Sequence, residues 1–142
     1  MKNENLDYCK HIRSELEKYY NGETYRCSEC NEIVHISNMS TLKETNKGYV
    51  LPCGCAIEDP YDLEQMCLYD YFNDVFDIIY YIGSEKEIRG VRLMVACGGP
   101  NIYIDTFRKT IELYWWTEYA TVDLHSDLCE EITELFAQVY AY

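Results

Sequence analysis

The first twenty residues carry apolar side chains at the spacing of an amphipathic helix. The apolar positions lie three or four residues apart, at Leu6, Cys9, Ile12, Leu16 and the pair Tyr19-Tyr20. Charged residues fill most positions between them, so one helical face is apolar and the other is polar. Asn21-Gly22 follows, and this dipeptide is typical of a helix end. The pattern predicts an amphipathic helix over residues 3–20.

Residues 24–58 show no helical period and few apolar positions for their length. Short strand-like pieces flank Cys27-Ser28-Glu29-Cys30, and another leads into Cys53-Gly54-Cys55. Between them, residues 37–47 are predicted to form a polar loop. With so little apolar surface to bury, this segment needs another source of stability.

Two interpretations fit the stretch after Pro60. In the first, residues 61–73 form a helix and the β-branched and aromatic run 75–82 forms a strand. In the second, a single helix runs over 62–82. That helix would align three acidic residues in one stripe, namely Asp70, Asp74 and Asp77. The composition of 75–82 favours the first interpretation.

Between residues 75 and 123, runs of β-branched and aromatic residues alternate with turn-forming residues. Two turn sequences are Cys97-Gly98-Gly99-Pro100 and Phe107-Arg108-Lys109. The alternation predicts an antiparallel meander of four or five strands. Trp115 and Trp116 are adjacent on a predicted strand. Their side chains should point to opposite faces, and one ring is expected to fill the core.

Four of the eight cysteines form two close pairs, Cys27 with Cys30 and Cys53 with Cys55. Zinc prefers four thiolates or imidazoles in a tetrahedron, and CxxC and CxC turns each bring two sulfurs to one metal. Gly54 suits the tighter CxC turn. The pairs predict one structural Zn²⁺ whose closed shell supports folding rather than catalysis. Reduced thiols without metal, or His35 in place of one cysteine, are the alternatives.

The C-terminal segment predicts a helix over 126–142 that Ser126 caps. Its buried face is expected to consist of Leu128, Ile132, Leu135, Phe136 and Val139. The predicted fold class is therefore α+β: an antiparallel β meander with flanking helices and a zinc-stapled β-hairpin insert. The length of 142 residues favours a single domain, 1–142, with a zinc-knuckle insert at 24–58 and the antiparallel sheet at 75–123.

Acidic residues outnumber basic residues by 25 to 12, and the formal net charge is −13. Such a charge argues against direct nucleic-acid binding over a broad surface, because it repels phosphates. No apolar run reaches the length of a membrane span, so no membrane association is expected. The N-terminal residues lack the apolar stretch of a signal peptide. We therefore expect a cytoplasmic protein whose thiols stay reduced.

The negative charge is concentrated in residues 59–82 and 118–142, which together carry twelve acidic residues and no lysine or arginine. Carboxylates one helical turn apart are separated by roughly 6 Å, close to the spacing of successive phosphates. Such a surface suits a cationic groove built for nucleic acid. The residues expected to bind a partner in this way are Asp70, Asp74, Asp77, Glu130, Glu131 and Glu134. The alternative is that these charges only keep the protein in solution.

No residue pattern indicates an enzyme. Gly98-Gly99-Pro100 lacks the spacing and the lysine of a phosphate-binding loop, and we interpret it as a turn between strands. Cys97 has no histidine near it in the sequence to act as a base, and His125 would approach it only through the fold. We therefore expect no catalytic residues. A metal-dependent or thiol enzyme is the least favoured hypothesis.

Two pieces of the sequence are distinctive, CGGPNIYIDT at 97–106 and ELYWW at 112–116. On these pieces, the stretch from Asp77 to Asp123 resembles small uncharacterised proteins from phages and mobile elements of gut Firmicutes. The resemblance implies a context of mobile DNA in the cytoplasm of a bacterial host. Small acidic proteins in that context often inhibit host defence nucleases.

Charge and resemblance together favour a non-enzymatic acidic inhibitor of the anti-CRISPR or antirestriction type. Such an inhibitor would bind a bacterial defence nuclease complex through that complex's basic nucleic-acid-binding groove, in the manner of a nucleic-acid mimic. The alternative function is a zinc-stabilised adaptor or regulatory protein-interaction module. One continuous negative face would favour the inhibitor, whereas scattered charge would favour the adaptor.

Overall fold

A computed structural model describes residues 4–140, and the chain forms two compact units. Unit 1 takes in the described residues of Met1–Glu17 and Phe72–Tyr142, and unit 2 is Lys18–Tyr71. The expected insert, 24–58, lies wholly within unit 2. Whether the two units behave as one domain stays a prediction.

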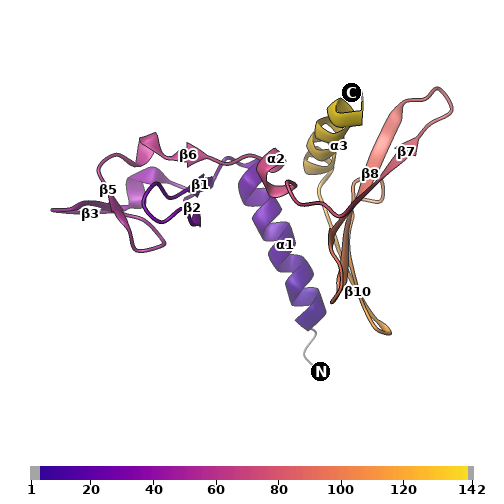
Figure 1. Cartoon of the computed structure of the whole chain (residues 1–142), viewed down its shortest axis with the longest axis horizontal. Helices are drawn as coiled ribbons and strands as arrows, with labels where there is room; N and C mark the ends of the chain where they lie inside the picture. The colour runs from indigo at the N-terminus through magenta and orange to yellow at the C-terminus, as the bar shows by residue number, and fades with distance from the viewer. Residues whose placement is uncertain (1–3, 141–142) are drawn as a thin grey trace. The chain divides into compact units, whose positions relative to one another are not determined.

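Unit 1 is built on a five-stranded antiparallel sheet (Figure 1). Its strands are β7 (Asp77–Ile82), β8 (Ile88–Ala96), β9 (Asn101–Asp105), β10 (Thr110–Trp115) and β11 (Glu118–Asp123). They lie in the order β11-β10-β9-β8-β7, so each strand pairs with the next one in sequence. This confirms the predicted meander with five strands, and β7 confirms the strand predicted at 75–82. Both predicted turns, at 97–100 and 107–109, lie between strands.

The strand register aligns apolar side chains of all five strands in one row. Ile78 pairs with Leu93, and Leu93 pairs with Ile104. Ile111 pairs with both Ile104 and Val122. Because side chains alternate between the two faces of a sheet, this row makes one face apolar, and that face requires a cover.

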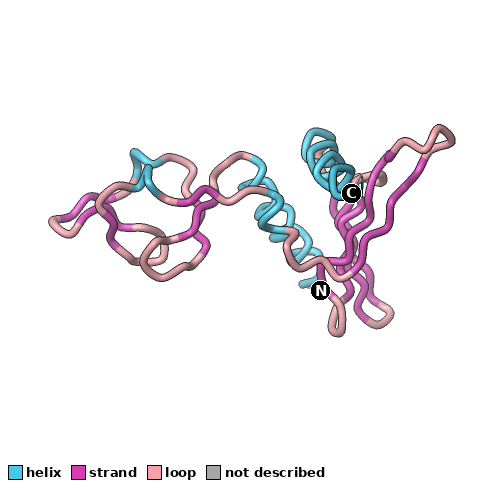
Figure 2. The backbone as a smooth tube through the Cα atoms, turned by 45° about the horizontal axis from the view of Figure 1, so that its top comes forward, coloured by secondary structure: helices cyan, strands magenta, loops and turns pink. Residues whose placement is uncertain are grey.

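Helix α1 (Glu4–Tyr20) confirms the predicted N-terminal helix, and its part in unit 1 covers the apolar face (Figures 1 and 2). Its buried residues are Cys9, Ile12 and Leu16, three positions that the periodicity selects. The Cys9 thiol donates to the carbonyl of Ala120 on β11 across 3.9 Å. Arg13 donates to the carbonyl of Asp123 across 3.2 Å. The predicted first residue of the helix, residue 3, lies outside the described residues.

Helix α3 (Ser126–Tyr140) covers the same face of the sheet (Figures 1 and 2). Its buried residues are Leu128, Cys129, Ile132 and Phe136. The Tyr80 hydroxyl on β7 donates to the carbonyl of Phe136 across 3.2 Å. The hydroxyls of Thr106 and Thr133 lie 2.7 Å apart. Both helices therefore lie on one side of the sheet, and within the described part of unit 1 no helix covers the other face.

Two expectations for α3 are wrong. The first turn is capped by His125, whose Nδ1 accepts from the backbone N–H of Leu128 across 3.2 Å. The Ser126 hydroxyl instead accepts from the Lys109 ammonium. Val139, expected on the buried face, is exposed in the last turn. Residues 141 and 142 of the predicted helix lie outside the described residues.

Unit 2 consists of short strands and single helical turns (Figure 2). Its elements are β1 (Thr24–Arg26), β2 (Ile33–His35), η1 (Met39–Thr41), β3 (Lys43–Thr45), β4 (Gly48–Val50), β5 (Ala56–Ile57), η2 (Pro60–Asp62), β6 (Glu64–Gln65) and α2 (Leu68–Tyr71). They form two three-stranded sheets, with the orders β2-β1-β6 and β3-β4-β5. The expected polar loop at 37–47 therefore contains η1 and an unpredicted strand, β3.

The helix predicted at 61–73 is wrong. Its first half pairs with a distant strand instead: Gln65 of β6 lies opposite Tyr25 of β1. The backbone N–H of Met66 also donates to the carbonyl of Thr24 across 2.8 Å. The only α-helical part is the single turn α2, which begins where the Asp70 carboxylate accepts from the backbone N–H of Cys67, while Tyr61 and Asp62 belong to the 3-10 turn η2. The sheet hydrogen bonds to β1 outweigh the local helical preference.

The alternative helix over 62–82 is wrong as well, so its acidic stripe does not form. Asp70 lies on α2, Asp74 in the turn before β7, and Asp77 on β7. The expectation that one tryptophan fills the core is also wrong. Trp115 is 37% exposed at the end of β10, and Trp116 is 87% exposed in the β10–β11 turn, where its φ is 57°.

Candidate metal centre

The first cysteine pair lies in a tight turn between β1 and β2. The backbone N–H of Asn31 donates to the carbonyl of Cys27 across 2.9 Å, and the backbone N–H of Cys27 donates to the carbonyl of Glu32 across 2.8 Å. Asn31 adopts a left-handed φ of 65°, a conformation that asparagine tolerates better than most residues. The turn curls the chain so that the sulfurs of Cys27 and Cys30 face the same point.

The second pair lies in a turn between β4 and β5. The backbone N–H of Gly54 donates to the carbonyl of Leu51 across 2.8 Å, and the backbone N–H of Leu51 donates to the carbonyl of Cys55 across 2.8 Å. Gly54 has a φ of 94°, which glycine reaches at little cost. The predicted role of Gly54 in the CxC turn is confirmed.

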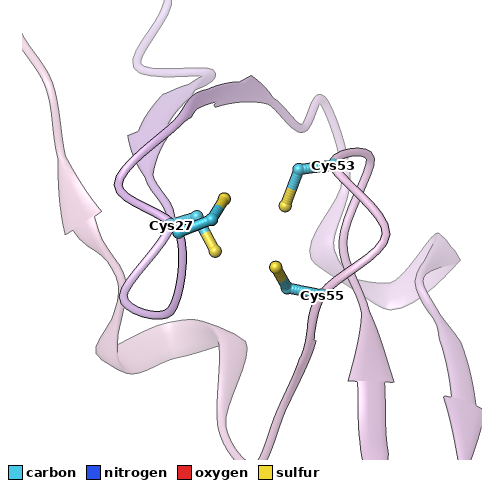
Figure 3. A group of neighbouring side chains, drawn as sticks. Cys27, Cys53 and Cys55 are labelled. Atoms are coloured by element: carbon cyan, nitrogen blue, oxygen red, sulfur yellow. The ribbon is translucent and has the colours of Figure 1, made fainter.

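The two turns bring all four predicted cysteines together. The Sγ atoms of Cys27, Cys30, Cys53 and Cys55 all lie within 4.8 Å of one another. Figure 3 shows the labelled side chains converging on one point from opposite turns. A metal with four sulfurs at about 2.3 Å has sulfur–sulfur distances of about 3.8 Å. The cluster therefore fits one metal ion after small side-chain movements, and no disulfide occupies it.

Crowding of the thiols shapes their proton affinities. The backbone N–H of Cys30 hydrogen-bonds to the Cys27 sulfur and lowers the pKa of this thiol to about 7. The neighbouring thiols of Cys30, Cys53 and Cys27 raise the pKa of Cys55 to about 12. The cluster thus accommodates one thiolate readily, whereas a second thiolate would be repelled by the first. A divalent cation removes this repulsion and lets all four sulfurs ionise.

The apolar cluster beside the thiols is small. Its buried residues are Cys27, Val34, Ile36, Leu51, Ile57 and Leu63. Two of the candidate ligands, Cys53 and Cys55, pack against it. The cysteine cluster and the core of unit 2 are therefore one structure, and metal binding would be coupled directly to folding.

His35 lies outside the cluster. Its Nδ1 lies 3.0 Å from the hydroxyl of the fully buried Thr24, and its ring packs edge-on against Tyr19. This geometry argues against His35 as a metal ligand in place of one of the cysteines. Cys9 and Cys129 are buried in unit 1, and Cys97 is exposed in the β8–β9 turn.

The six carboxylates predicted to bind a partner are divided among α2, the turn before β7, β7 and α3. Glu130, Glu131 and Glu134 are exposed on α3, which covers one face of the sheet in unit 1. Asp77 belongs to the uncovered face, as the pairing of Asp77 with Met94 and of Met94 with Tyr103 shows. Within unit 1 the charge is therefore distributed over both sides. That these residues bind a partner stays a prediction.

A buried ionic cluster on the uncovered face escaped the sequence analysis. Arg92 Nη1 lies 3.0 Å from Asp105 Oδ2 and 2.7 Å from Glu112 Oε2. The Tyr114 hydroxyl donates to Glu112 and the Tyr81 hydroxyl donates to Asp105. The sequence signal for this cluster is weak: charged residues of opposite sign occupy positions of adjacent strands that face away from the helices, and only the strand register shows that they meet.

Comparison with protein-family models, with curated proteins and with solved structures finds no match to this chain. None of the described helices is long and apolar enough to cross a membrane. The four-cysteine cluster is the feature that most directly indicates a function.

Proposed function

We propose that the four cysteines bind one zinc ion with a structural role. The observation that carries this proposal is the convergence of four sulfurs within 4.8 Å from two tight turns. Four thiolates in a tetrahedral arrangement are a ligand set that zinc favours. Four protein ligands also leave no coordination position for a substrate or a reactive water, which supports a role in folding rather than in catalysis.

Elemental analysis of protein purified without added metal tests this proposal. We expect about one zinc per chain in the wild type and a loss of zinc in Cys55→Ser. Cys97→Ser is the matched control, because Cys97 is an exposed thiol outside the cluster, and it should retain the metal. A metal-free wild type, or equal zinc in both variants, contradicts the proposal.

We further propose that the protein is a non-enzymatic, zinc-stabilised protein-interaction module. Four cysteine ligands would leave a bound ion no open coordination position, and the six predicted carboxylates are divided among α2, β7, α3 and one turn. Both points support this general form of the function. The net charge of −13 favours a partner with a basic surface, since opposite potentials speed and orient association.

Inhibition of a defence nuclease is a more specific candidate. The twelve acidic residues of 59–82 and 118–142, with no basic residue among them, support it. The resemblance at 97–106 and 112–116 supports a mobile-DNA context. In this proposal the partner is a complex with a basic nucleic-acid-binding groove, and the protein itself does not bind nucleic acid.

A pull-down from a bacterial lysate that contains restriction and CRISPR complexes tests the specific candidate. Reversal of Asp70, Asp74 and Asp77 to lysine should weaken capture, and added salt should weaken wild-type capture. The control reverses Glu4, Glu15 and Glu17 in the N-terminal stretch 1–18, which carries four acidic and four basic residues. Equal effects of the two triple variants, or capture that salt does not change, would favour a module whose charge only keeps it soluble.

A further inference from the structure

The uncovered face of the five-stranded sheet carries exposed aromatic rings in contact with one another. The ring centroids of Tyr103 and Tyr114 are 5.9 Å apart, and those of Tyr114 and Tyr119 are 5.0 Å apart. Tyr114 and Tyr119 are both exposed. Three contacting tyrosines on a face without a helical cover are typical of an interaction surface, where tyrosine combines apolar area with a polar group.

A shallow hollow of about 370 Å³ lies in this face. Aromatic and apolar walls come from Tyr103, Tyr114, Ile79 and Met94, and polar groups come from Asp77, Asn101 and Arg92. The walls suit the flat faces of a planar group, and the carboxylate of Asp77, which also lines the hollow, suits a positive charge.

The charge of this face is negative despite the presence of Arg92. Arg92 is already paired with the two carboxylates of Asp105 and Glu112. Among the described residues, Asp77 has no ion pair within 4.0 Å, although its carboxylate accepts from the backbone N–H of Ile78. An incoming cation therefore meets an available carboxylate, whereas an incoming phosphate meets net negative charge.

The same face already holds one guanidinium group, that of Arg92, against a tyrosine ring. The Cζ atom of Arg92 lies 4.3 Å from the centroid of the Tyr103 ring, within the range of a cation–π interaction. Arginine forms this contact better than lysine, because its guanidinium is planar, weakly hydrated and able to stack while it donates to a carboxylate.

From these observations we propose that the uncovered sheet face binds an arginine-bearing segment of a partner protein, with one guanidinium group seated in the hollow beside Asp77, Tyr103 and Tyr114. The inference rests on the proposed interaction function and names its surface. Of the six predicted carboxylates, only Asp77 takes part in the central contact. Tyr103 and Tyr114, which the sequence did not indicate, form the rest of it.

Titration of the zinc-loaded, ¹⁵N-labelled full chain tests the proposal. The probes are the peptide acetyl-Gly-Arg-Gly-Arg-Gly-amide and its counterpart with lysine in place of arginine. We expect the arginine peptide to shift signals of Asp77, Ile79, Met94 and Tyr103. The lysine peptide should bind about threefold more weakly, as a cation–π difference at an exposed site implies.

Two pairs of variants localise the contact. Ile79→Arg places a cation in the hollow and should raise the dissociation constant on the order of tenfold. Ile82→Arg is its matched control, because Ile82 lies on the same strand outside the hollow and is 46% exposed, against 48% for Ile79. Asp77→Asn should raise the dissociation constant about threefold. Glu85→Gln removes one carboxylate charge from the exposed turn that follows β7, outside the predicted partner-binding residues, and should leave binding unchanged.

Several results would overturn the proposal. These are equal binding of both peptides, equal effects within a variant pair, signal shifts confined to other surfaces, self-association that buries the face, or binding of a single-stranded oligonucleotide there. If a partner captured in the pull-down binds Ile79→Arg as tightly as the wild type, the proposed surface is overturned while the interaction function remains. If the peptide binds as expected but no protein partner is found, the interaction function fails and the guanidinium site remains.

Discussion

Unit 1 aligns apolar side chains in one row across five strands, whereas the apolar cluster of unit 2 consists of five buried aliphatic residues and the buried thiol of Cys27, one of the four candidate ligands. The strands of unit 1 are five to nine residues long, and those of unit 2 are two or three. A segment as short as 18–71 buries too little apolar surface to offset its conformational entropy with ease. The two units therefore depend on different forces, and each force has its own test.

Removal of the metal should have the largest effect, and only on unit 2. Structural zinc contributes apparent free energy on the order of 10 kcal/mol in small zinc-dependent domains. We expect a strong chelator, or Cys55→Ser, to collapse the dispersed NMR signals of residues 18–71 while the strands of unit 1 keep theirs. Re-addition of zinc to the chelated wild type should restore the spectrum. Simultaneous loss of both units, or no loss, would contradict this division.

Loss of Arg92 should have the largest effect in unit 1. Asp105 is fully buried and Glu112 is nearly so, and both depend on Arg92 for charge compensation. Arg92→Met leaves two uncompensated carboxylates and should lower the free energy of unfolding of unit 1 by about 3 kcal/mol. Chemical denaturation followed by tryptophan fluorescence measures this, because Trp115 and Trp116 both lie in unit 1. Zinc content should not change.

The same cluster predicts a pH dependence. Burial raises the pKa of Glu112, but the hydrogen bonds from Arg92 and Tyr114 outweigh burial, so the pKa lies below its ordinary value of 4.5. A carboxyl whose pKa is lowered by folding stabilises the fold above its unfolded pKa, and that stabilisation is lost as pH falls through the lowered value. The stability of unit 1 should therefore decrease below about pH 4.5. Glu112→Gln should flatten the decrease, whereas Glu118→Gln on an exposed position should leave it intact.

Features that depend on neighbouring residues could be predicted from the sequence, whereas features that depend on distant strand pairing could not. The period of α1, the turns of the meander and the spacing of the cysteine pairs are local patterns, and the structure confirms each of them. The pairing of Gln65 with Tyr25 is not local, and it converts an expected helix into β6. Arg92, Asp105 and Glu112 meet only through strand register, so their ion pairs were not foreseeable from spacing along the chain.

Alanine at Gly54 should have the smallest effect, and it tests whether the metal centre depends on backbone geometry. Gly54 has a φ of 94°, and a Cβ added there would meet no atom within 4 Å. The cost of Gly54→Ala is therefore backbone strain alone, about 1 kcal/mol, and chelator competition should show zinc affinity reduced about fivefold.

Gly98→Ala is a matched control, because Gly98 has a φ of 86° and equally open surroundings, but lies in unit 1. It should lower the stability of unit 1 by a similar amount and leave zinc affinity unchanged. If both substitutions alter zinc affinity equally, the metal centre is coupled to unit 1, and the two units do not have separate sources of stability.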